Sequence, residues 1–155
     1  MGTKFSTRIW VSVVGIASIF FGSKGYADTV ISVADFGLKP DTRENAVAYV
    51  QKAIEACRGK EPVTLVFPEG RYDFWPQYAH EKNYYETNTY DVFPKRLAML
   101  FEGLHNITVD GNGSQFVMHD RIQPITVENC DGVTLKNFSI DWDISLTAQA
   151  RVTKV

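Results

Sequence analysis

The sequence has little cysteine, no excess of basic residues and no apolar run long enough for a stable membrane span. Two cysteines in 155 residues cannot hold together a disulfide-rich miniprotein. A formal net charge of −2 gives none of the basic surface expected of a nucleic-acid-binding protein. With 45% hydrophobic and 22% charged residues, the composition also excludes a disordered tail and a collagen-like fibre. What remains is a globular chain of about one domain, at roughly 100–200 residues per domain.

The first 27 residues have the three parts of a secretory signal peptide. Lys4 and Arg8 make its start basic, and residues 9–22 form an apolar run shorter than the ~20 residues that span a bilayer. Small residues precede the expected cleavage site before Asp28. We therefore predict a signal peptide at 1–27 and a periplasmic or secreted protein without a membrane anchor after cleavage.

The remaining residues, 28–155, are more acidic than the whole chain, because the signal segment carries three basic residues and no acidic one. This charge favours neutral or cationic substrates over polyanions such as pectin or nucleic acid. Export would expose Cys57 and Cys130 to an oxidising compartment. Nothing in their spacing brings the two thiols together, so their pairing stays open.

One helix is predicted, over about residues 41–58. Asp41 or Thr42 can accept its first free backbone N–H groups, and Glu44 lies where a capping box needs an acidic residue. One apolar stripe follows at helical spacing, formed by Val47, Val50, Ile54 and Cys57.

The other regular segments all have the pattern of short strands. No second helical pattern separates them, which disfavours an alternating α/β sheet. We predict strands at 28–33, 63–67, 97–101, 107–109, 115–118, 125–127 and 133–144.

An internal repeat indicates how these strands are arranged. A shift of 26 residues places Met99 on Ile125 and Ile107 on Val133, apolar on apolar. A period in this range, made of strands without helices, is typical of a parallel β-helix, in which coils stack on one another. The fold class predicted is therefore all-β, a parallel β-helix solenoid, with the early helix covering the end of the first coil.

The strand predicted at 133–144 has alternating sides. Its large apolar residues are expected to face the interior, and Asp141 and Asp143 to face solvent. The apolar set is Phe138, Ile140, Trp142 and Ile144.

Two stretches resemble known sequences. Residues 33–37, the helix and residues 66–72 (Val-Phe-Pro-Glu-Gly-Arg-Tyr) resemble the N-terminal cap of pectate-lyase-like β-helix enzymes. A narrower set is similar to glycoside hydrolase family 110, exported bacterial α-1,3-galactosidases, although Asp120 stands where that pattern has glycine. The set comprises residues 72–76, 79–82, 95–96, 110–114, Phe116, His119, Arg121, Pro124 and 137–142.

This resemblance implies a right-handed parallel β-helix that removes terminal α-1,3-linked galactose from glycans. It implies inversion at the anomeric carbon, no cofactor and a galactose-terminated glycan as the partner. The catalytic carboxylates are expected on later coils, beyond Val155, and none can be matched to a position in this chain. We therefore expect residues 28–155 to be an incomplete and inactive part of the domain, ending in a strand-like run without a closing element.

Asp141 and Asp143 are weak catalytic candidates on their own chemistry. At i and i+2 on a strand their Cα atoms would lie about 6.5–7 Å apart. That fits the roughly 6.5–9.5 Å between the carboxyl groups of inverting glycosidases. Any such acidic pair would fit, and a solvated outer face is the simpler interpretation.

Four further residues are weak candidates for substrate binding. His119 and Arg121, expected on one strand face, could contact sugar hydroxyls or anchor a loop, or be an ordinary paired His and a solvated Arg. Trp75 and Tyr78 belong to an aromatic-rich segment, 72–93, that could stack on sugars or simply pack over the first coil. No metal is predicted, because the His and acidic residues lack ligand spacing.

Two other functions stay open. One is a different carbohydrate-active β-helix enzyme, such as a polygalacturonase or a polysaccharide lyase. The other is a non-catalytic β-helix that binds a partner or coats a surface. Clustered acidic residues on later coils would favour a hydrolase, and polar ladders without them a binding protein.

Overall fold

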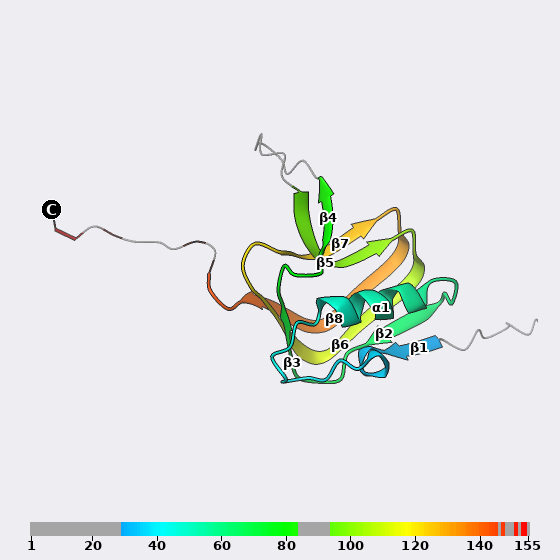
Figure 1. Cartoon of the computed structure of the whole chain (residues 1–155). Helices are drawn as coiled ribbons and strands as arrows, with labels where there is room; N and C mark the ends of the chain where they lie inside the picture. The colour runs from blue at the N-terminus through cyan, green and yellow to red at the C-terminus, as the bar shows by residue number, and fades with distance from the viewer. Residues whose placement is uncertain (1–28, 84–93, 146, 148–150, 152, 155) are drawn as a thin grey trace, which may run out of the picture.

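The structure is a computed structural model that describes residues 29–83, 94–145, 147, 151, 153 and 154. The predicted signal peptide lies outside these residues. They form a mostly β fold with one α-helix (Figure 1). Within the described part of the chain, no helix combines the length and apolar character needed to cross a bilayer.

The strands form two sheets, and nearly all neighbouring strands are parallel. One sheet has the order β1-β2-β6-β3 with β8 also paired to β6, and the other has the order β4-β5-β7. The β4–β5 pair is antiparallel. The strands are β1 (Thr29–Ser32), β2 (Val63–Val66), β3 (Arg71–Phe74), β4 (His80–Asn83), β5 (Pro94–Glu102), β6 (His105–Met118), β7 (Gln123–Glu128) and β8 (Asp131–Trp142).

The residues aligned by the 26-residue shift are direct partners in both sheets. Met99 of β5 pairs with Ile125 of β7, and Ile107 of β6 pairs with Val133 of β8. Beyond Asp110 the offset changes, because β6 has two extra residues before Ser114, which pairs with Phe138. The sequence shift therefore describes a pairing register that is interrupted by a bulge.

The helix α1 (Val47–Cys57) begins later than predicted. Asp41 does not cap it, because its backbone N–H and its carboxylate both bond the backbone of Arg71, each at 2.9 Å. Asn45 supplies the acceptor instead, with its Oδ1 3.1 Å from the N–H of Val47. A capping box does occur, but on the short 3-10 helix η1 (Val33–Phe36), where Ser32 is the N-cap.

The predicted apolar stripe of α1 is confirmed, since all four of its residues are buried. The helix packs against β1 and β2 of one sheet and β5 of the other. Its buried side joins a single hydrophobic cluster shared with both sheets. An aromatic group lies in this core, made by Phe67, Tyr72, Phe74 and Phe116, with neighbouring ring centroids 4.7–6.2 Å apart.

The burial predicted for the last strand is only partly right. Phe138 and Trp142 pack against the core, and Phe138 stacks on Phe116. Ile140 is 37% exposed, and Ile144 lies past the end of β8 and is 78% exposed. Among the described residues β8 pairs only with β6, so no neighbouring strand covers its other edge.

Both cysteines are free thiols in the structure. Cys57 is buried on α1, and this burial raises the pKa of its thiol to about 11. Cys130 is half-buried, and its Sγ lies 3.3 Å from the carbonyl oxygen of Phe101.

The bulge in β6 generates a test of this register. A Cβ on Gly111 would lie 2.5 Å from the Cβ of Phe138 and 2.7 Å from the carbonyl oxygen of Asn137, closer than real side chains allow. We expect Gly111→Ala to lower the free energy of unfolding by about 2 kcal/mol, measured by urea denaturation. The control is Gly59→Asn, because Gly59 has open space around it and a φ of +74° that Asn tolerates. Equal stability of the two variants would contradict the close packing of β6 on β8.

Candidate functional site

The candidate site is built around the carboxylate of Asp73, whose side chain is fully buried. Asp73 lies on β3 between two core aromatics, Tyr72 and Phe74. Because side chains alternate along a strand, Asp73 faces away from those rings. The backbone of Asp73 contacts the segment that precedes α1, because the backbone N–H of Ala46 donates to the Asp73 carbonyl at 2.8 Å.

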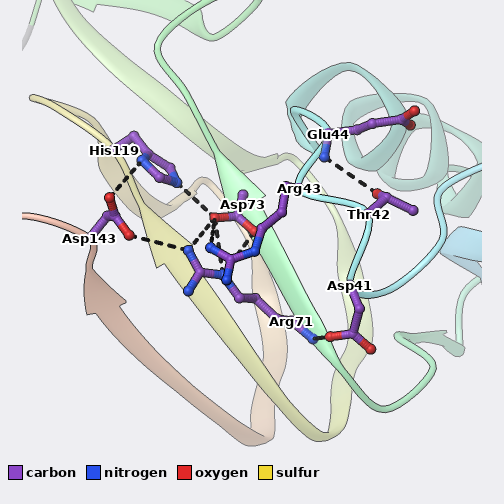
Figure 2. A network of polar contacts seen from close by, with 8 residues as sticks. All are labelled: Asp41, Thr42, Arg43, Glu44, Arg71, Asp73, His119 and Asp143. Atoms are coloured by element: carbon purple, nitrogen blue, oxygen red, sulfur yellow. Dashed lines mark hydrogen bonds and ion pairs between the residues drawn. The ribbon is translucent and has the colours of Figure 1, made fainter.

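Three basic side chains surround this carboxylate (Figure 2). Arg71 donates from Nε to both oxygens at 3.0 and 3.1 Å and from Nη2 to Oδ1. His119 lies with Nε2 at 2.8 Å from Oδ1, and the Arg43 guanidinium lies 3.9 Å away. A buried carboxylate is tolerated only when it is paired in this way.

Burial by itself would raise the pKa of Asp73, but the hydrogen bonds from Arg71 and His119, together with the positive charges of Arg71 and Arg43, outweigh it. The pKa of this carboxyl is therefore below its usual range. The same contact, with a smaller contribution from Asp143, raises the pKa of the Arg71 guanidinium. Asp73 is thus a fixed negative charge at neutral pH, unsuited to donating a proton as a general acid.

A second carboxylate joins the same group from beyond the end of β8. Asp143 accepts from Nη2 of Arg71 at 3.3 Å, and its other oxygen lies 3.8 Å from Nδ1 of His119. Its backbone N–H continues the sheet by donating to Met118 at 3.0 Å, as His119 donates to Phe74 at 2.9 Å. We call Arg71, Asp73, His119 and Asp143 the Asp73 network. It ties together the chain at the ends of β3, β6 and β8.

Asp141 and Asp143, the two weak catalytic candidates from the sequence, have different surroundings. Asp141 is exposed near the end of β8 and accepts the N–H of Trp142 at 2.8 Å. Asp143 lies past the strand and is 44% exposed, but it is held by Arg71 and is not simply solvated. The two carboxylates therefore have different contacts, and a shared catalytic role for them stays a prediction.

His119 and Arg121 are expected on one strand face, but β6 ends at Met118 and both residues lie past its end. Asp120, which follows His119, has a left-handed φ of 56° that redirects the chain. His119 is paired with Asp73, as expected from the sequence if this residue is an ordinary paired histidine. Arg121 is exposed and has no side-chain partner among the described residues.

Trp75 and Tyr78 have different surroundings. The Trp75 ring stacks on His119, with centroids 3.9 Å apart and planes 6° apart, and so covers the Asp73 network. Tyr78 is 74% exposed. The rest of the aromatic-rich segment from Tyr84 to Phe93 lies outside the described residues.

Reasoning from sequence missed Arg71 and Asp73. Their signal was available, because Arg71-Tyr72-Asp73-Phe74 alternates polar and aromatic residues in the way a half-buried strand does. No strand is predicted there from the sequence, so β3 is missed as well. Across the described ranges, no cluster of three or more His, Cys, Asp or Glu could hold a metal ion.

Comparisons with known proteins find similar chains. The chain is 62% identical over 128 residues to alpha-1,3-galactosidase B of Bacteroides thetaiotaomicron, covering 83% of this chain and 21% of that protein. It is 39% identical over 125 residues to alpha-1,3-galactosidase A of Shewanella woodyi, covering 81% of this chain and 20% of the relative. No protein-family model matches it. The chain spans about a fifth of the length of these curated relatives.

Removing the central carboxylate should destabilise the fold. Asp73→Asn leaves Arg71 without its main partner, so we expect the free energy of unfolding to fall by about 3 kcal/mol in urea denaturation. Asp141→Asn is the matched control, because Asp141 is exposed and makes no ion pair among the described residues, and we expect it to change stability by about 0.5 kcal/mol or less. A cost for Asp73→Asn no greater than for Asp141→Asn would contradict the role of the network.

The lowered pKa of Asp73 also predicts an acid dependence. Its contribution to stability is complete above the pKa of an unfolded Asp, about 3.9, and is lost as the pH falls towards the lower folded-state pKa. We expect the urea midpoint of the wild type to fall more steeply than that of Asp73→Asn as the pH is lowered from about 5 to about 2. The difference should develop below about pH 3.9, the pKa of an unfolded Asp. Parallel pH profiles for the two proteins would show that Asp73 carries no such coupling.

Proposed function

This chain is homologous to bacterial alpha-1,3-galactosidases over most of its length, and we propose that it is part of an exported glycoside hydrolase that removes terminal α-1,3-linked galactose from glycans. The observation that carries the proposal is the 62% identity to a protein named for that activity. The similarity extends to a third relative, an alpha-1,3-galactosidase B of Phocaeicola vulgatus, at 36% identity over 148 residues that include 93% of this chain.

We propose a right-handed parallel β-helix as the architecture of the complete domain, with α1 covering its N-terminal end. Its support is the parallel pairing of β5 with β7 and of β6 with β8 at a 26-residue offset, which changes only at the bulge in β6. Helices do not intervene between these strands, unlike in α/β sheets.

A further pass of chain over β8 is part of this proposal. Leu135 and Ile140 are 39% and 37% exposed on β8. The buried Nε1 of Trp142 has no hydrogen-bond partner among the described residues. Buried donors without a partner are rare in native proteins. A following strand would cover the apolar side chains and pair the open edge of β8.

The chemistry we propose is inversion by two carboxyl groups without a cofactor. One protonates the leaving oxygen and the other activates water on the opposite face of the sugar. Asp73 is buried and fully paired, and Asp143 is held by Arg71 and His119. We therefore assign the acid and base to parts of the complete enzyme other than the Asp73 network, whose proposed role is to hold three passes of chain in place.

Export to the periplasm or the medium completes the proposal, because the substrate is a glycan outside the cell. The support is the signal-like composition of residues 1–27.

The activity can be tested with the complete protein that contains this chain. We expect release of galactose from a terminal α-1,3-galactoside, with β-galactose as the first product by NMR because the reaction inverts an α-linkage. Asp141→Asn should keep the wild-type kcat, since Asp141 is exposed and outside the network.

Three results would overturn this proposal. Cleavage of a uronate polymer without galactose release would favour a polygalacturonase or a lyase. Loss of turnover in a folded Asp141→Asn protein would return Asp141 to the catalytic machinery. Glycan binding without hydrolysis would favour a non-catalytic β-helix.

A further inference from the structure

We propose that the pocket between α1 and the β4–β5 hairpin, together with the neighbouring Tyr78, binds a single neutral sugar ring. The pocket has a volume of about 140 Å³. That is smaller than the roughly 300–1,000 Å³ of sites for drug-sized ligands, and suits part of one pyranose. The proposal goes beyond glycosidase activity, because it concerns binding by groups that the hydrolytic chemistry above does not use.

One side of the helix makes one wall of the pocket. Three residues of α1 and its C-cap residue line this wall at i, i+3, i+4 and i+7, and two residues of β5 and one of β4 line the other side. They are Gln51, Ile54, Glu55, Arg58, Leu100, Glu102 and His80. This helical stripe lies beside the buried one, so the same helix covers the core and borders the pocket.

The pocket combines an apolar floor with a polar rim. Ile54 and Leu100 are only 4% and 9% exposed, so the apolar floor that they form is small. The ring of His80 and the Oε1 of Gln51 have no polar partner among the described residues, so they can bond hydroxyl groups. Apolar C–H faces and hydroxyl edges are the two surfaces that a pyranose presents.

The charges in the pocket favour a neutral ligand. Arg58 is paired with Glu55 at 3.1 Å and also donates to the carbonyl of Glu102 at 3.2 Å. The carboxylate of Glu102 is paired with Lys82 at 2.7 Å. An ionic ligand would have to displace one of these pairs, whereas a sugar can bond their outer oxygen and nitrogen atoms without doing so.

The loop from Trp75 to Ala79 is held next to this pocket by side chains from the helix region. Nε2 of Gln51, a pocket residue, donates to the carbonyl of Tyr78 at 2.8 Å. Nδ2 of Asn45 donates to the carbonyl of Gln77 at 3.0 Å. These bonds order the loop before any ligand arrives, which lowers the entropy lost on binding.

Tyr78 itself has two unusual features. Its φ is 68°, a left-handed conformation that is an outlier for a bulky residue, and its ring is 74% exposed. Strained residues of this kind persist where the surroundings hold them, and they concentrate at ligand clamps. An exposed phenol ring on a backbone held by Gln51 offers a face on which the C–H groups of a sugar can stack.

NMR of the complete protein tests this site directly. We use methyl α-D-galactopyranoside as the probe, a choice that rests on the proposed function, and methyl α-D-glucopyranoside as a second neutral pyranose. Saturating titration should shift the side-chain amide signal of Gln51 and the ring signals of His80. Tyr78→Asn removes the ring but suits the left-handed backbone, and should weaken binding at these reporters by about tenfold. Tyr78→Phe keeps the ring and should bind as the wild type does.

Several outcomes would overturn the proposal. It fails if neither sugar shifts Gln51 or His80, or if a folded Tyr78→Asn protein binds both probes unchanged. It also fails if galacturonate, an anion, shifts these signals at lower concentration than the neutral sugars. Local shifts in a protein that hydrolyses no galactoside would leave the site standing and remove only the proposed function. Hydrolysis without local shifts would do the reverse.

Discussion

The parallel pairing of β6 with its neighbours is the constraint on which the rest of the structure depends. β6 pairs with β2 and β3 along one edge and with β8 along the other, so it joins segments from the start to the end of the described chain. Parallel strands cannot be joined by tight hairpins, and the chain must travel round before each return. In this molecule those connections run through α1 or through the second sheet, and the helix and the two sheets share one core (Figure 1).

Stacking strands in register places side chains from distant parts of the sequence in rows, and this accounts for the Asp73 network. Arg71 and Asp143 are 72 residues apart but meet because β3 and β8 flank the same strand. The buried carboxylate of Asp73 is the costly member of the group. Its burial is tolerated only while Arg71 and His119 stay paired with it, and this pairing fixes the positions of three strand ends. The network therefore holds these strand ends together, and its buried, paired carboxylate is unsuited to donating a proton.

Reasoning from sequence predicted the features that arise from local periodicity. The buried stripe of α1, most strands and the 26-residue register between Met99 and Ile125 all follow from spacing along the chain. The helix start was wrong because the capping side chain of Asp41 has a competing partner, the backbone of Arg71, which is distant in sequence. The strand β3 was missed because its aromatic residues were interpreted as part of one long aromatic-rich segment that could stack on sugars.

By itself the sequence determined the elements and the spacing at which they pair, because period-two and helical patterns are written in consecutive residues. It also determined that the chain resembles part of a glycosidase. Only the tertiary structure decided which polar residues act together. It placed His119 and Arg121 past the end of β6 and brought Arg71 and Asp73 together with His119 and Asp143. The physical reason is that His119 and Asp143 reach Asp73 and Arg71 from neighbouring strands. The neighbour across a parallel sheet is set by the path of the whole chain.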